Sequence, residues 1–225
     1  MKNTVFVIFF ALTLMGCANN SNSTDQGAQD QAATKTDTNA EEQHSKENDN
    51  VKCIYVYQRD SSEVRWTAYK TTSKKGVSGI FDNFLVKIPK DTLWSMKEAI
   101  PHTKFVIAPS SVNSGNEGRD AKLVKYFFKT LGGISGQFQT VGEDGNGTMQ
   151  LIWNGMDQVL PYSYEIRDDS LFIKATINFA KWRADKNAAA LNNACKKLHS
   201  GKDGVSKLWP DVDVKAKIVF KKYCG

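Results

Sequence analysis

The chain has 225 residues, with 30 Lys and Arg against 24 Asp and Glu, 3 His and 4 Cys. This length allows one large domain or two small ones. Three histidines without ligand spacing, and the absence of Gly-x-Ser-x-Gly and His-Glu-x-x-His motifs, point away from metal-dependent or nucleophilic catalysis.

The N-terminus reads as an export signal. Lys2 precedes a charge-free apolar run over residues 4–15, which is too short to span a bilayer as a mature helix. We therefore expect a signal peptide over residues 1–16. Residues 14–17 (LMGC) also resemble a bacterial lipobox, in which the cysteine becomes the new N-terminus and carries acyl chains. We expect lipidation of Cys17, and plain secretion with an incidental Cys17 is the alternative.

A polar segment follows. Residues 18–50 contain seven acids, two lysines and no aromatic, Val, Ile or Leu residue, so they cannot bury enough apolar surface to offset chain entropy. We expect residues 17–50 to be the lipidated cysteine and a disordered linker, and residues 51–225 to be the folded domain. That domain is basic, which could attract anionic lipid or phosphate, although ordinary solubilising charge is the alternative. An exported protein is not expected to bind nucleic acid.

Alternating apolar and polar residues after residue 51 predict half-buried antiparallel strands. Clear runs lie at 64–69, 171–179 and 212–220. Between residues 134 and 180, Asp-Gly, Asn-Gly and Asp-Asp-Ser sequences mark tight turns, which divide this part of the chain into four strands joined as hairpins. In total we count eight or nine strands.

Three helices interrupt the strands. We expect a short helix capped by Asp91 and ended by Pro101, a second over residues 119–131, and a third over residues 185–200. Each has an apolar side that needs a surface to lie on.

The cysteines suggest a disulfide without settling its pairing. With Cys17 assigned to lipid, three remain in an oxidising compartment, and three cannot all pair with one another. Cys53 begins the first apolar segment and Cys224 ends the last, so the two would meet if these segments are neighbouring antiparallel strands. A Cys195–Cys224 bond is the alternative, and Cys195 would otherwise be a buried thiol.

These elements predict an all-β domain. Eight strands can close an up-and-down antiparallel barrel, whose inward faces meet in one interior. Small inward residues such as Ala68, Ala175 and Ala216, alternating with bulky ones, would leave room there. A β-sandwich packed solid is the alternative.

Several motifs resemble those of the YceI-like family. Residues 66–70 (WTAYK) followed by 76–81 (GVSGIF) are similar to its opening strands, and 113–115 (NSG), 119–128 (RDAKLVKYFF) and 134–136 (ISG) continue the similarity. It extends over about residues 53–222. The resemblance implies an eight-stranded lipocalin-like barrel with a few short helices, whose elongated apolar interior holds a polyisoprenoid or other long-chain lipid. It implies no catalytic residue and no cofactor. The helix around Cys195 is similar to that of a cysteine-bearing lipoprotein subgroup.

From the alternation and this resemblance we assign the residues of a ligand site. The predicted wall residues are Trp66, Ala68, Phe81, Phe105, Phe138, Trp153, Ile173 and Ala175, and Phe127 and Phe128 are placed at the mouth. Many relatives have a His where this chain has Lys122. Lys122 and Lys129 lie beside the candidate lid, so an anionic headgroup is a possible variation. Arg119 and Lys122 are the candidates to bind it, and solvated lysines opposite an apolar face are the alternative.

The expected function is that of a non-catalytic carrier, lipid-anchored through Cys17 in a bacterial cell envelope and facing the periplasm. Ala18 lacks the acidic character that can signal inner-membrane retention, which slightly favours the outer membrane. The alternative is a structural or adhesion module that binds a protein or polymer partner. Neither reading predicts an oligomeric state.

Overall fold

The computed structural model describes residues 51–225, so the predicted signal peptide, Cys17 and the linker lie outside the described residues. The ten strands are β1 (Cys53–Lys70), β2 (Lys75–Phe81), β3 (Phe84–Lys87), β4 (Lys104–Ile107), β5 (Val112–Asn113), β6 (Ile134–Val141), β7 (Asn146–Trp153), β8 (Met156–Arg167), β9 (Ser170–Asn178) and β10 (Leu208–Cys224). Within residues 51–225 no helix combines the length and the apolar character needed to cross a membrane.

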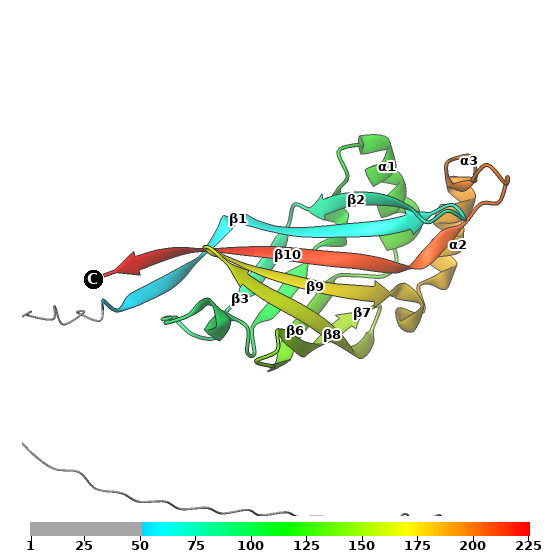
Figure 1. Ribbon diagram of the computed structural model, residues 1–225. Coiled ribbons are helices and arrows are strands. Elements are labelled where there is room, and N and C mark those ends of the chain that lie inside the picture. The colour runs from blue at the N-terminus through cyan, green and yellow to red at the C-terminus, as the bar shows by residue number, and fades with distance from the viewer. Residues whose placement is uncertain (1–50) are drawn as a thin grey trace, which may run out of the picture. The chain divides into compact units, whose positions relative to one another are not determined.

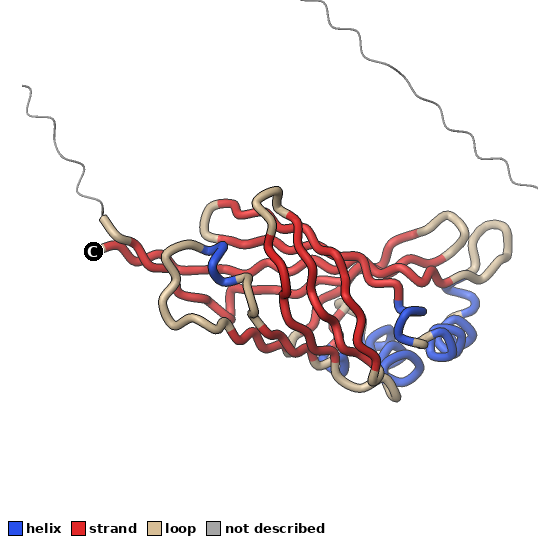
Figure 2. The backbone as a smooth tube through the Cα atoms, turned by 90° about the horizontal axis from the view of Figure 1, so that it is seen from below, coloured by secondary structure: helices blue, strands red, loops and turns tan. Residues whose placement is uncertain are grey.

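The strands form one antiparallel sheet in the order β3-β4-β6-β7-β8-β9-β10-β1-β2-β5. The sheet curls around a common interior, and most of the helical residues gather at one end of it (Figures 1 and 2). The antiparallel, lipocalin-like fold class expected from the sequence is thus confirmed, and the solid β-sandwich is not the observed fold.

The expected count of eight strands differs from the observed ten because two strands are interrupted. A bend at Asp82 and Asn83 separates β2 from β3, and the 3-10 turn η2 (Pro109–Ser111) separates β4 from β5. The two interrupted strands face each other, since β3 pairs with β4 and β2 pairs with β5. The backbone bonds of the bend continue between them, from Asp82 N to Ser111 O at 3.0 Å and from Ala108 N to Asn83 O at 3.0 Å. The two ends of the sheet are therefore parts of the same pair of bent strands.

The first and last strands extend beyond their neighbours as a two-stranded ribbon (Figure 1). In this ribbon Cys53 lies directly opposite Cys224, and the two form a disulfide with their Cα atoms 4.1 Å apart. Of the two pairings left open by the sequence, the structure has this one, and Cys195 is a buried free thiol. The strand register decides which cysteine pairs with Cys224, because the start of one antiparallel strand lies beside the end of its neighbour.

Turns separate the four hairpin strands from residue 134 onward at Asp144-Gly145, at Asn154-Gly155 and at Asp168-Asp169, as expected. The Asn146-Gly147 sequence, also expected to be a turn, instead begins strand β7. Asn154 and Gly155 both have positive φ, of 50° and 68°, and Asp168 has a φ of 52°. Such left-handed backbone is tolerated by Gly and Asn and matches the twist of the flanking strands. The predicted division into β6, β7, β8 and β9 is confirmed.

The helices are shorter than the sequence pattern predicts. The first is only the 3-10 turn η1 (Met96–Ala99). Its N-cap position is Ser95, so the prediction of Asp91 as the cap is wrong. The second divides into α1 (Glu117–Lys122) and the π-helix η3 (Leu123–Phe128), and the third into α2 (Asp185–Ala194) and α3 (Lys196–His199). A further 3-10 turn, η4 (Phe179–Trp182), was not expected. Tertiary contacts decide such boundaries, because isolated helices of this length are marginal in water.

Candidate functional site

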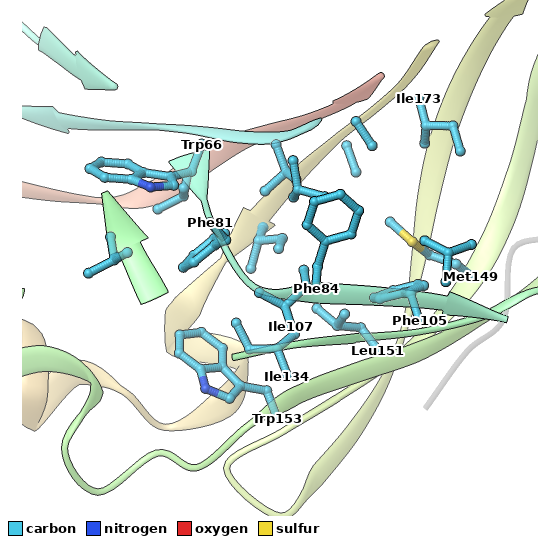
Figure 3. Close-up of a pocket in the computed structure, with 18 of the residues that line it drawn as sticks. Trp66, Phe81, Phe84, Phe105, Ile107, Ile134, Met149, Leu151, Trp153 and Ile173 are labelled. Carbon is cyan, nitrogen blue, oxygen red and sulfur yellow. The ribbon is translucent and has the colours of Figure 1, made fainter. Parts of the chain in front are cut away.

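The barrel interior contains a cavity of about 180 Å³. In the same measure a single water needs only about 10–15 Å³, so the cavity is much larger than a packing defect. Figure 3 shows side chains of different strands, among them Phe84 and Ile173, projecting into this space. Thr103 is the one lining residue with a hydroxyl, and it donates to Ala99 O at 2.6 Å; no charged side chain of the described residues lines the cavity.

The structure places all ten predicted wall and mouth residues on the cavity lining. They are Trp66, Ala68, Phe81, Phe105, Phe127, Phe128, Phe138, Trp153, Ile173 and Ala175. The strand alternation also selected the right faces, since every inward residue of 64–68 and of 171–179 lines the cavity.

Small residues keep the interior open where β1, β10 and β9 lie side by side. Each inward row across the three strands contains one alanine, as the register shows. The rows are Val64–Ala216–Ile173, Trp66–Val214–Ala175 and Ala68–Val212–Ile177. Because an alanine side chain ends at Cβ, each row leaves space that a larger residue would fill.

Two wall aromatics lie against glycines of the neighbouring strand. Gly79 is opposite Trp66, and a Cβ added there would lie 2.6 Å from Trp66 Cζ2. Gly136 is likewise opposite Phe105, whose ring occupies the space where its Cβ would be. The glycines therefore let these rings lie along the wall, which leaves the centre of the barrel free.

A helical cover closes one end of the cavity. Leu123 and Phe127 of η3 and Leu191 of α2 all line it. The two elements are tied together by Asn187, whose Nδ2 donates to Phe127 O at 2.8 Å. A π-helix is a rare conformation that is often found at functional sites. Here its wider turn places Leu123, Phe127 and Phe128 on the cavity side together.

The opposite end is closed by the segment around η1, from which Ile88, Ala99 and Ile100 line the cavity. This segment lies near the start of β1, where Tyr55 N donates to Leu93 O at 2.9 Å. The helical cover lies near the end of β1, where Thr71 N donates to Lys207 O at 2.9 Å. An extended strand rises about 3.3 Å per residue, so the two covers are separated by most of the length of the barrel.

Two buried side-chain polar atoms among the described residues have no hydrogen-bond partner, Tyr57 Oη and Trp153 Nε1. Trp153 lines the cavity, and its N–H could donate to an oxygen of a bound molecule. Behind the wall, Tyr162 packs against Phe138 with ring centroids 5.0 Å apart. Burial, together with the neighbouring Tyr164, raises the pKa of Tyr162 to about 12.

The two candidate headgroup residues do not reach the cavity. Arg119 is exposed on α1 and Lys122 is half-buried at its end, and neither lines the interior. The neighbouring Asp120 holds the loop before the helix, because its carboxylate accepts from Ser114 N at 3.1 Å. The structure thus separates the two cations from the ten wall residues.

No group of three His, Cys, Asp or Glu side chains within residues 51–225 could hold a metal ion. His199 is buried, and its Nδ1 lies 2.8 Å from Asn192 Oδ1. Burial and then the charge of Lys70 lower its pKa. The other histidine of the domain, His102, has a φ of 60° in the turn before β4.

Sequence reasoning missed several lining residues outside the clear strand runs. Examples are Phe84, Ile107, Met149, Leu151 and Leu191. Phe84 follows the unforeseen bend between β2 and β3, so its face could not be assigned from alternation. Met149 and Leu151 alternate within β7, so periodicity alone predicts their inward faces.

The fold and the cavity define a class of protein: an antiparallel, lipocalin-like barrel with an apolar interior. No family model matches the sequence, and no curated protein matches it. Among solved structures, a polyisoprenoid-binding domain from Saccharophagus degradans is similar at 14% identity, with a TM-score of 0.51 over 76% of this chain and 98% of that one. This likeness shows that the two chains share a fold.

Two other solved structures are similar with lower TM-scores. BcnA of Burkholderia cenocepacia has 12% identity and a TM-score of 0.49, covering 73% of this chain and 99% of that one. The YceI protein of Campylobacter jejuni has 14% identity and a TM-score of 0.41, covering 67% and 86%.

Proposed function

We propose that this protein is a non-catalytic binding protein that encloses a polyisoprenoid or another long-chain lipid. The observation that carries the proposal is the cavity, which is lined by apolar side chains and by no charged one of the described residues. Burying apolar surface contributes about 25 cal/mol per Å², so such a lining favours a hydrocarbon over any polar ligand. The similar domain from Saccharophagus degradans, which is described as polyisoprenoid-binding, supports the same ligand class.

A hollow interior also favours this function over the alternative of a structural or adhesion module. A barrel that serves only as a scaffold gains stability when its interior is filled, because each void loses packing contacts. Here Ala68, Ala175 and Ala216 leave the centre open.

The direct test is native mass spectrometry of the full chain extracted from its own membranes. We expect a stoichiometric lipid of mainly hydrocarbon character to be released on denaturation. Repeated recovery of protein without any such lipid would contradict the proposal.

Filling the cavity should abolish capture of the lipid. Ala175→Phe adds a phenyl ring to the inner face of β9, and an excess of even one methylene in an apolar pocket costs about 10–200-fold in selection. We expect lipid recovery to fall at least about tenfold, measured by mass spectrometry of folded protein. Ala216→Phe, on β10, provides a second variant with the same expectation.

The matched control is Lys174→Phe, which adds a phenyl ring one position away on the exposed face of the same strand. It should retain the lipid. Equal loss in Lys174→Phe and Ala175→Phe would mean that the cavity is not the binding site.

We also propose that Cys17 carries acyl chains and anchors the protein to a bacterial envelope membrane, facing the periplasm, with the outer membrane favoured. Two or more acyl chains hold a protein stably, whereas one binds only marginally. Cys17→Ser should therefore move nearly all of the protein from the membrane fraction to the soluble fraction in a high-salt wash, which screens electrostatic attachment. Retention of the variant in washed membranes would contradict the anchor.

A further inference from the structure

The positive charge of the domain is concentrated at the end that carries the helical cover. Three segments, 70–75, 117–131 and 179–207, contain fourteen Lys and Arg against four Asp and Glu. We call them together the basic end. The remaining residues of 51–225 contain thirteen of each sign. The net charge of the folded part therefore comes entirely from the basic end.

Contacts between the three segments show that they form one surface. Asn187 Nδ2 donates to Phe127 O at 2.8 Å, which joins the third segment to the second. Thr72 Oγ1 donates to Asp203 Oδ2 at 2.6 Å, which joins the first to the third. The turn after β1 and helices α2 and α3 lie at the same end of the barrel in Figure 1.

The cations of this surface form no ion pair with another described residue, and most of them face solvent. All five ion pairs formed within residues 51–225 lie outside the basic end. Eleven of its fourteen cations are exposed: Lys74, Lys75, Arg119, Lys125, Lys129, Lys181, Arg183, Lys186, Lys196, Lys197 and Lys202. The charges also repel one another, since the pKa of Lys70 is lowered by burial and then by Lys75 and Arg119.

Two apolar side chains of this surface are exposed. Leu198 of α3 is 60% exposed and follows Lys196 and Lys197 directly, and Val205 in the loop after it is 51% exposed. Nearby, Lys207 Nζ lies 3.7 Å from the centroid of the Trp209 ring. Exposed apolar side chains among lysines are typical of surfaces that lie in a membrane interface.

We infer that the basic end docks on a bilayer that contains anionic phospholipid. An extended anionic surface can meet all three segments at once, and each Lys or Arg near such a surface contributes about a fivefold gain in affinity. Leu198 and Val205 distinguish this partner from a soluble polyanion, because only a bilayer offers acyl chains below the phosphates. The cover formed by η3 and α2 then faces the membrane.

The docking does not depend on the proposed function. Only the further idea that a lipid passes between the cavity and the bilayer rests on it. If the cavity holds a lipid, Leu123, Phe127 and Leu191 are the side chains that separate it from the bilayer. The docking itself depends on surface residues and can be measured whether or not the cavity is occupied.

The test is co-sedimentation of the full chain carrying Cys17→Ser with phosphatidylcholine vesicles, and with equimolar phosphatidylcholine–phosphatidylglycerol vesicles. We expect binding to the anionic vesicles alone, weakened by salt. Replacing Lys196, Lys197 and Lys202 together by Gln should reduce the affinity about 100-fold. Adding Leu198→Ser to the triple variant should reduce the affinity for anionic vesicles further. It should leave the affinity for soluble polyphosphate unchanged.

A matched variant removes the same charge elsewhere, with Lys87, Lys104 and Lys217 replaced by Gln on exposed strand positions. It should bind the anionic vesicles nearly as well as the parent chain. Equal weakening in the two triple variants, equal affinity for neutral vesicles, or polyphosphate binding as tight as vesicle binding would each overturn the inference. None of these outcomes bears on whether the cavity holds a lipid, which mass spectrometry decides separately.

Discussion

Replacing Cys53 and Cys224 together by serine should lower the free energy of unfolding by about 5 kcal/mol. The disulfide joins residues 171 positions apart, so reducing it releases nearly the whole folded chain from one closed loop. Loop-closure entropy grows with loop length, which places this bond near the upper end of the usual range. The two-stranded ribbon that it ends should also fray, because residues 53–58 pair with only β10 along most of their length.

Urea denaturation of the full chain, followed by tryptophan fluorescence, measures this effect. Cys195→Ala is the control, since Cys195 is a buried free thiol and its loss removes only a small side chain. We expect the control to change the unfolding free energy by about 1 kcal/mol. Comparable values for the control and the double variant would mean that the disulfide contributes little.

Trp182→Ala should be the most damaging single substitution in the core, at about 3–5 kcal/mol. Trp182 is fully buried at 0% exposure, and its Nε1 donates to Leu151 O at 3.3 Å. Its backbone carbonyl accepts from Asn154 Nδ2 at 2.8 Å, so the indole bond and this backbone bond both hold turn η4 against the hairpin between β7 and β8. Truncation removes the ring and its bond to Leu151 O, and it leaves a void in the core.

Trp94→Ala is the matched control, because Trp94 is 56% exposed. It should lie within about 0.5 kcal/mol of the parent chain in the same urea experiment. If the two variants unfold at the same urea concentration, Trp182 does not hold the core together as the structure indicates.

The sequence pattern predicts most of the residues of the cavity wall that lie on clear strand runs. It does not predict the elements that close the ends of the barrel. Alternation over 64–68 and 171–179 identified inward faces, because a strand turns successive side chains to opposite sides. Helix bounds were less accurate: the apolar face of 119–131 was correct, but its division into α1 and the π-helix η3 depends on packing over the cavity. No local pattern marked Trp182 as the largest fully buried side chain.

The sequence by itself determined the all-β class, the hairpin turns and the inward residues, because these depend on backbone preferences and on periodicity over a few residues. The tertiary structure decided three other features. They are the Cys53–Cys224 pairing, the interruptions that divide two of the eight expected strands into four, and the concentration of positive charge at one end. Each of these brings together residues that are far apart in the chain, and such proximity is set by sheet register and packing, not by local sequence.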